Sequence, residues 1–205
     1  SLTPSARTSL QYSHQRVGLQ NLAAMQLTGS DVSAMSLSQT YGRGTSAGAF
    51  SLSRKATESY GPSTDRHGGV LSLLQSVTEE NVGLTQGFSS QFGAGKLELS
   101  RAVTTTEKPN ELAVSQSSDA LRLSTNLWAQ TAFSGAYERT ESSLPTGTDT
   151  QRRTINLSRA FGPGQVSMGL SNLVSVTNGV TTETTTQNYR LPALLAGTGL
   201  QMGFD

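Results

Sequence analysis

Hydrophobic and polar residues alternate most regularly along residues 84–106. The hydrophobic residues that share one face of the extended chain are Leu84, Phe88 and Phe92, followed by Leu97, Leu99 and Val103. A period of two residues is typical of a β-strand with one face against apolar material. The segment Gly93, Ala94 and Gly95 lies between the two halves, and its glycines tolerate the positive φ angles that tight turns require. Residues 84–106 are therefore predicted to form a β-hairpin.

The same pattern occurs earlier in the chain, which makes the hairpin a repeat. Residues 37–59 align with residues 84–106 without a gap, and a shorter echo, INLSRA at 155–160, matches LELSRA at 97–102. The identical pairs are Leu37/Leu84, Gln39/Gln86, Ala47/Ala94, Gly48/Gly95, Leu52/Leu99, Ser53/Ser100, Arg54/Arg101 and Thr57/Thr104. Repeated hairpins predict an architecture that extends by adding strands. We therefore expect one β-rich domain over residues 1–205, with internal hairpin repeats at 37–59 and 84–106.

Further strands are predicted where alternation or a short apolar run lies between turn residues. These strands are 6–14, 33–41, 49–60, 70–77, 119–135, 155–161, 166–176, 180–187 and 199–204. Residues 17–27 fit a strand or a short helix, and the apolar spacing in 70–77 also fits a helix, although a strand is favoured there. Turns or loops are predicted at 29–31, 61–69, 79–80, 107–110, 142–152 and 178–179. The fold class is therefore all-β, built from antiparallel repeated hairpins.

Composition agrees with strands that have one apolar face. Apolar residues make up 34% of the chain and charged residues only 14%, and Ser, Thr, Gly and Gln account for much of the rest. The net charge is +1 with scattered Lys and Arg, so nucleic acid is not expected as a partner. The absence of cysteine excludes disulfides and thiolate chemistry. The chain has no apolar run of about 18 residues, so no membrane-spanning helix is predicted. It begins at Ser1 without a signal peptide, so we expect a mature or truncated product of a larger chain.

No residue pattern points to catalysis. His14 and His67 are the only histidines, and neither has the matched ligands of a metal site. The glycine-containing segments 42–44, 93–95 and 162–164 lack the following Lys-Ser/Thr pair of a phosphate-binding loop. Glu79 and Glu80 are interpreted as solvated turn residues. The sequence therefore predicts no enzyme, no cofactor and no bound metal.

Several strands together resemble those of bacterial outer-membrane β-barrel proteins. The segments that carry the resemblance are 84–92, 97–103, 121–133, 166–176 and the terminal 200–204. In such proteins the apolar strand face meets lipid and the small polar face meets the lumen. The resemblance implies a structural or porin-like component of the cell envelope, located in the bacterial outer membrane or at the cell surface. Membrane lipid or detergent is then the expected partner, with a homo-oligomer or other envelope proteins as protein partners.

Two other interpretations remain open. If one repeat unit holds three strands, at 70–77, 82–92 and 96–106, alternate units reverse direction, which a stacked or open sheet accommodates more easily than a barrel. The second interpretation is therefore a β-solenoid or a surface or fibre subunit that self-associates through its sheet edges. The third is a soluble β-sandwich that acts as a binding module.

Three arginines are the candidate binding residues. Arg54, Arg101 and Arg159 all fall in phase with the apolar stripes of their strands. If those strands are neighbours, the guanidinium groups line one level and can contact phosphate or carboxylate groups of lipid or polysaccharide. The alternative is that each arginine pairs locally with Glu58, Glu98 or Glu107.

Overall fold

The described residues of the chain form β-strands and their connections. A computed structural model describes residues 5–21, 26–42, 46–62, 71–90, 93–127, 130–144, 147–161 and 164–190. The strands are β1 (Ser5–Asn21), β2 (Gln26–Gly42), β3 (Gly48–Pro62), β4 (Leu71–Ser90), β5 (Gly93–Glu107), β6 (Val114–Leu127), β7 (Thr131–Ser142), β8 (Thr148–Phe161), β9 (Gly164–Thr177) and β10 (Val180–Arg190). The expected all-β fold of antiparallel hairpins is confirmed.

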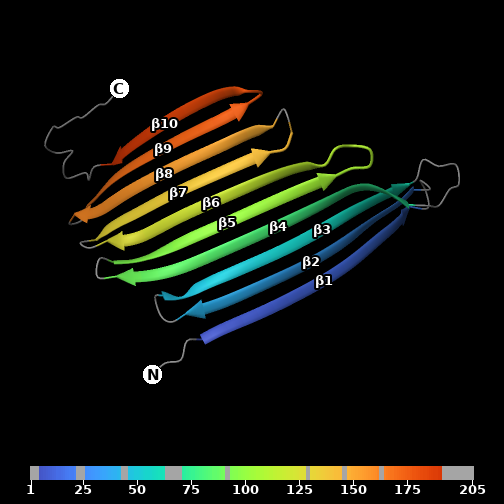
Figure 1. Ribbon diagram of the computed structural model, residues 1–205, viewed down its shortest axis with the longest axis horizontal. Helices are drawn as coiled ribbons and strands as arrows, with labels where there is room; N and C mark the ends of the chain where they lie inside the picture. Colours follow the sequence, from blue (N-terminus) through green and yellow to red (C-terminus); the bar gives the residue numbers. More distant parts are fainter. Residues whose placement is uncertain are drawn as a thin grey trace.

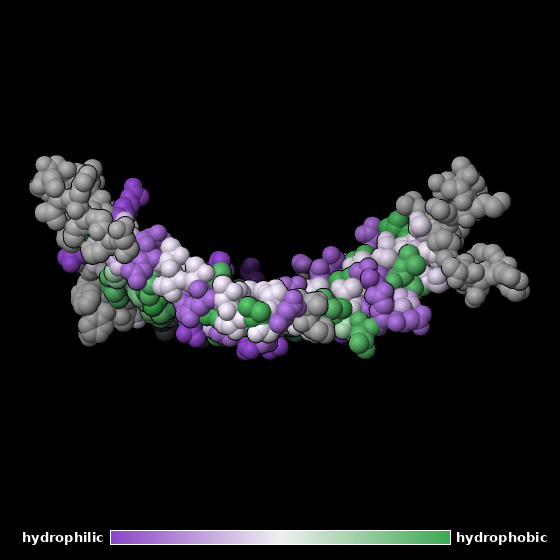
Figure 2. Space-filling model, turned by 90° about the horizontal axis from the view of Figure 1, so that it is seen from above, coloured by the Kyte–Doolittle hydropathy of each residue, from purple (hydrophilic) through white to green (hydrophobic). Residues whose placement is uncertain are grey.

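All ten strands lie in one sheet, in the order β1 to β10, and each pairs antiparallel with its neighbours in sequence (Figure 1). Within the described residues the sheet is open, because β1 and β10 form its two edges. Figure 2 shows a single bowed layer, hollowed along one side, with no second layer packed against it. The only buried residues of the described part are Gly48 and Gly61, so the sheet has no buried hydrophobic core there.

The two ends of the sheet differ in their connections. At the end nearer both termini, the strands are joined through residues 43–47, 91–92, 128–130 and 162–163 (Figure 1). At the other end the connections are 22–25, 63–70, 108–113, 143–147 and 178–179, and two of them, 63–70 and 108–113, are longer than any at the first end. Asn178 and Gly179 form the tight turn predicted between β9 and β10, with φ angles of 52° and 77°. We call the end with residues 43–47, 91–92, 128–130 and 162–163 the short-turn end, and the opposite end the long-loop end.

The sequence repeat corresponds to two strands, and the expected three-strand unit is wrong. Leu37 pairs with Leu52 in the β2–β3 hairpin, and Leu84 pairs with Leu99 in the same way in β4–β5. Residues 70–77 and 82–92 were expected as separate strands, but Leu71–Ser90 is one continuous strand, β4. Glu79 and Glu80 therefore lie in mid-strand and not at a turn. A two-strand unit preserves strand direction from one repeat to the next, so the repeat gives no reason to prefer a stacked sheet.

Four other expected strand or turn assignments are also wrong. The predicted strand 119–135 is divided between β6 and β7, and the turn between them includes Gln130 at a φ of 57°. Residues 29–31 lie within β2, and most of the expected loop 142–152 belongs to β8, leaving 143–147 as the connection. Residues 93–95, expected as the hairpin turn, begin β5 instead. Residues 91–92, most of the loop 61–69 and the predicted strand 199–204 lie outside the described residues.

Gly95 is required in β5 for a reason other than a turn. A Cβ atom at this position would lie 2.3 Å from the Phe88 ring and 2.6 Å from the Ser124 carbonyl oxygen. Both contacts are far below van der Waals distance, so only glycine allows the ring of Phe88 to lie across β5. The repeat identity between Gly48 and Gly95 has the same basis, because a Cβ at Gly48 would lie 2.6 Å from the ring of Tyr41.

Candidate functional site

The register divides the strand residues into two faces. Residues paired directly across an antiparallel sheet point to the same side. We call the side that holds Leu10 and its successive partners the apolar face, and the side that holds Ser9 and its partners the small-residue face. These two surfaces are the candidate functional site, because the described residues form one layer with no interior.

Most of the large hydrophobic side chains of the described strands, and all the aromatic ones, lie on the apolar face, and the exceptions on the other face are Val17, Val32, Val77, Val114, Leu173 and Val180. Those on the apolar face are uncovered: Leu10 is 69% exposed, Ile155 49% and Tyr189 59%. The set includes Leu10, Tyr12, Met35, Leu37, Phe50, Leu52, Val82, Leu84, Leu97, Leu99, Leu121, Leu123, Phe133, Tyr137, Ile155, Leu157, Met168, Leu170 and Tyr189. A continuous exposed apolar surface of this extent marks an interaction with lipid or protein.

The small-residue face consists mainly of Ser, Thr, Gly and Ala, and no aromatic residue of the described strands lies on it. One row of paired residues crosses all ten strands without a charge or a large side chain. Its members are Gln11, Ser36, Ser53, Asn81, Ala102, Ser118, Thr140, Thr150, Ser175 and Thr182. Within this row, the Asn81 amide donates a hydrogen bond to the Ser53 hydroxyl at 3.5 Å. This face is suited to water and not to an apolar partner.

Most of the large hydrophobic residues of the apolar face form a band that slants across the rows of paired residues, while Tyr12, Met35, Val103, Val174 and Val176 lie outside it on the long-loop side. The band occupies four rows in turn, each two residues further along the strands towards the short-turn end. The rows are Leu10, Leu37, Leu52 and Val82 on β1–β4; Phe50, Leu84, Leu99, Leu121 and Tyr137 on β3–β7; Leu97, Leu123, Ile155 and Leu170 within β5–β9; and Phe133, Leu157, Met168 and Tyr189 on β7–β10. We call these residues the slanted band.

Charged residues border the slanted band on the long-loop side. Arg54 of β3 pairs with Glu80 of β4 at 3.3 Å, and Arg101 of β5 pairs with Asp119 of β6 at 3.7 Å. Further along, the border includes Arg139 of β7, which is ion-paired with Glu141, and Arg153 of β8. From β3 to β8, the residues of this border lie progressively nearer the short-turn end, as those of the slanted band do. We call these residues the charged border.

The structure places the three predicted arginines in two locations. Arg54 and Arg101 belong to the charged border, and β4 separates their strands. Arg159 lies near the short-turn end of β8, between Thr131 and Val166, on the other side of the slanted band. Arg54 and Arg101 have ion-pair partners, but these are Glu80 and Asp119 and not the expected glutamates. Contact with lipid or polysaccharide stays a prediction for all three.

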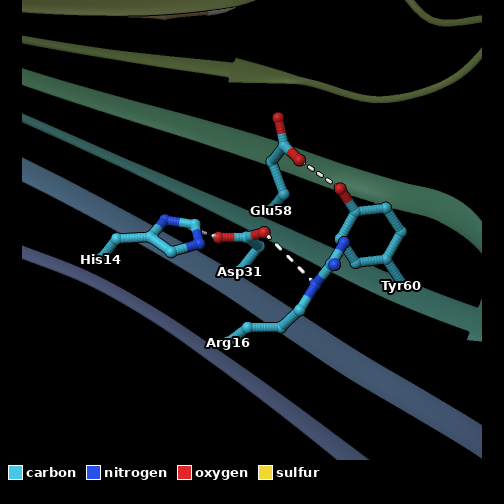
Figure 3. Close-up of polar contacts among 5 residues, drawn as sticks. All are labelled: His14, Arg16, Asp31, Glu58 and Tyr60. Atoms are coloured by element: carbon cyan, nitrogen blue, oxygen red, sulfur yellow. Dashed lines mark hydrogen bonds and ion pairs between the residues drawn. The ribbon is translucent and has the colours of Figure 1, made fainter.

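Beyond the charged border, a second polar cluster lies towards the long-loop ends of β1–β3 (Figure 3). Asp31 is contacted from both sides, by His14 at 3.3 Å and by Arg16 at 3.5 Å. Beside it, the Tyr60 hydroxyl donates a hydrogen bond to Glu58, which raises the pKa of the Tyr60 phenol. His14 contacts the Asp31 carboxylate, and no group of three or more metal-ligating residues occurs in the described part of the chain.

Sequence reasoning missed the carboxylates of the charged border. Glu80 was assigned to a turn, yet it lies in phase with Val82 and Leu84, which places it on the apolar face. That phase relation was the available signal. Asp119 gives the same signal, because it lies in phase with Leu121 and Leu123. The contacts of both carboxylates with arginines depend on the strand register and could not be read from one strand.

Comparison with known proteins gives no relative: no family model, curated protein or solved structure matches the chain. No helix of the described residues is long and apolar enough to cross a membrane. The functional argument therefore depends on the two faces and the slanted band.

Proposed function

We propose that this sheet belongs to a β-barrel of the bacterial outer membrane, with the apolar face towards lipid and the small-residue face towards the lumen. Its role is structural or that of a passive, porin-like conduit. The observation that carries the proposal is the slant of the hydrophobic band relative to the strands. Membrane barrels present an apolar belt to lipid and small or polar side chains to the interior, on alternating residues of each strand.

The slant has the size that a tilted strand requires. The band moves by about one residue per strand, which is about 3.3 Å along the strand for each strand spacing of about 4.8 Å. A band with this slope makes an angle of about 35° with the rows of paired residues. In membrane barrels the strands are tilted by about 35–45°, so a belt that is level in the bilayer crosses the rows at a similar angle. The slope thus supports a bilayer as the partner of this face.

The charged border and the connections support the same arrangement. The border follows the slope of the band, so it too is level in a bilayer, and it lies on the side of the long-loop end. An arginine on the lipid face costs about 2–4 kcal/mol at the midplane but about 0–1 kcal/mol near the interface. Short turns at one end and longer loops at the other are also typical of such barrels. Both termini of the described sheet are at the short-turn end (Figure 1).

A barrel also requires partners for the two edge strands. Exposed backbone N–H and C=O groups are too costly in lipid, so the outer edges of β1 and β10 must be paired. They can pair with each other or with further strands, and either arrangement preserves the two faces.

Detergent dependence tests the proposal. We expect the purified chain to give a β-type circular dichroism spectrum only in detergent micelles or lipid. On gels, the unheated protein should migrate differently from the heated protein, because the closed sheet resists dodecyl sulfate at room temperature. A folded monomer in detergent-free buffer would contradict the membrane proposal.

A second function is favoured by the edges of the sheet. β1 has 17 residues, and its described side chains from Ala6 to Gly18 are all exposed, so its outer edge can template a strand of another copy. The chain would then be a self-associating surface or fibre subunit. In this case sedimentation in detergent-free buffer should show concentration-dependent particles or filaments, with the β-type spectrum retained.

A further inference from the structure

The small-residue face has an excess of positive charge. Its basic residues in the described strands are Arg7, Lys55, Lys96, Arg122, Arg152 and Arg190. Its acidic residues are Glu79, Glu98 and Glu138. The charges of the apolar face have the opposite balance, because carboxylates outnumber arginines there. The nearly neutral chain thus separates its charge between the two sides of one sheet.

Ion pairing neutralises the carboxylates of the small-residue face. Glu79 contacts Lys55 at 3.8 Å, Glu98 contacts Lys96, and Glu138 accepts a hydrogen bond from Arg122 at 2.6 Å. The basic residues left over are Arg7, Arg152 and Arg190, which have no ion-pair partner among the described residues. Arg152 lies directly across from Glu138 in the register, next to the Arg122 pair.

The remaining side chains of this face leave space beside these charges. They are mainly Ser, Thr, Gly and Ala, and they include no aromatic ring within the described strands. Small side chains fill less of a barrel interior than the bulky residues that close the smallest barrels. A water-filled passage bounded by such a face would have hydroxyl groups along its wall and unpaired guanidinium groups to attract anions.

We propose that the small-residue face lines an aqueous passage that favours small inorganic anions over cations. This inference rests on the proposed function, since only a lumen converts the charge of one face into ion selectivity. Among the three unpaired arginines, Arg152 is expected to contribute most to this selectivity. It lies on β8 within the sheet, while Arg7 and Arg190 lie on the edge strands.

The test is the reversal potential of the full chain in planar bilayers of phosphatidylcholine under a KCl gradient. We expect the reversal potential to shift from zero towards the equilibrium potential of chloride. Arg152→Glu should lower the chloride-to-potassium permeability ratio by about twofold to fivefold, as one charge reversal acting through water allows. The matched control is Arg153→Glu, which makes the same change at the next residue but on the apolar face. It should leave the ratio unchanged.

The other outcomes show whether this inference fails alone or together with the proposed function. Cation preference, or a ratio that responds equally to Arg152→Glu and Arg153→Glu, overturns the anion passage. So does the absence of conductance from protein that is folded in micelles and heat-modifiable, and in that case the barrel itself stands. A chain that folds as a detergent-free monomer overturns both proposals.

Discussion

At the scale of the residue, neighbouring positions on one strand face opposite environments. Leu99 of β5 lies in the slanted band and is 40% exposed, while Ser100 lies on the small-residue face. In the proposed arrangement Leu99 contacts lipid and Ser100 contacts water. The same substitution at these two positions therefore measures the environment of each face.

Leu99→Arg is expected to destabilise the chain by about 1–2 kcal/mol, between the costs at the interface and at the midplane, because Leu99 lies two residues inside the charged border and a charge there loses part of its hydration. Ser100→Arg should change stability little, because the new side chain can extend into water. Urea unfolding in lipid vesicles measures both changes in the free energy of unfolding. Equal effects of the two substitutions would contradict the assignment of the faces.

At the scale of the element, alternation predicts strand faces well but strand ends poorly. The common face of Leu97, Leu99 and Arg101 follows from the two-residue period alone, without knowledge of the tertiary structure. The turn between β6 and β7 was missed because Gln130 carries its positive φ without Gly, Asn or Asp. The mid-strand position of Glu79 and Glu80 was missed because paired carboxylates usually indicate a turn.

A substitution at Gln130 tests whether its positive φ is strained. Its φ of 57° costs an L-residue about 1 kcal/mol relative to glycine. Gln130→Gly should therefore raise the free energy of unfolding by about 1 kcal/mol in a urea titration. Gln116→Gly, at a paired position within β6, should lower it by about 0.5–1 kcal/mol, because glycine in a strand loses more backbone freedom on folding. A loss of stability in both variants would indicate that the Gln130 side chain stabilises the turn.

At the scale of the whole molecule, the sequence predicts an all-β chain of hairpins, but it does not determine how the hairpins combine. The slanted band depends on the register of every strand pair, for example Leu52 with Val82 and Leu123 with Gly135. Register arises from pairing over the whole sheet, so no single strand contains it. For the same reason, the candidate arginines were found in the sequence but the partners of Arg54 and Arg101 were not.

The central claim is that the apolar face of the slanted band lies against lipid. The most direct measurement is a nitroxide scan of residues 97–103 in β5, with the protein reconstituted in lipid vesicles. The chain contains no cysteine, so each introduced cysteine carries the only label. Oxygen, which partitions into lipid, and a water-soluble nickel chelate report which environment surrounds each label.

We expect oxygen accessibility to alternate, high at 97 and 99 and low at 98 and 100, with the nickel chelate showing the reverse pattern. Beyond position 101, at the charged border, oxygen accessibility on the apolar face should fall as the label approaches the membrane surface. Equal access of the nickel chelate to both faces would contradict the account, because it would mean that water and not lipid covers the hydrophobic band.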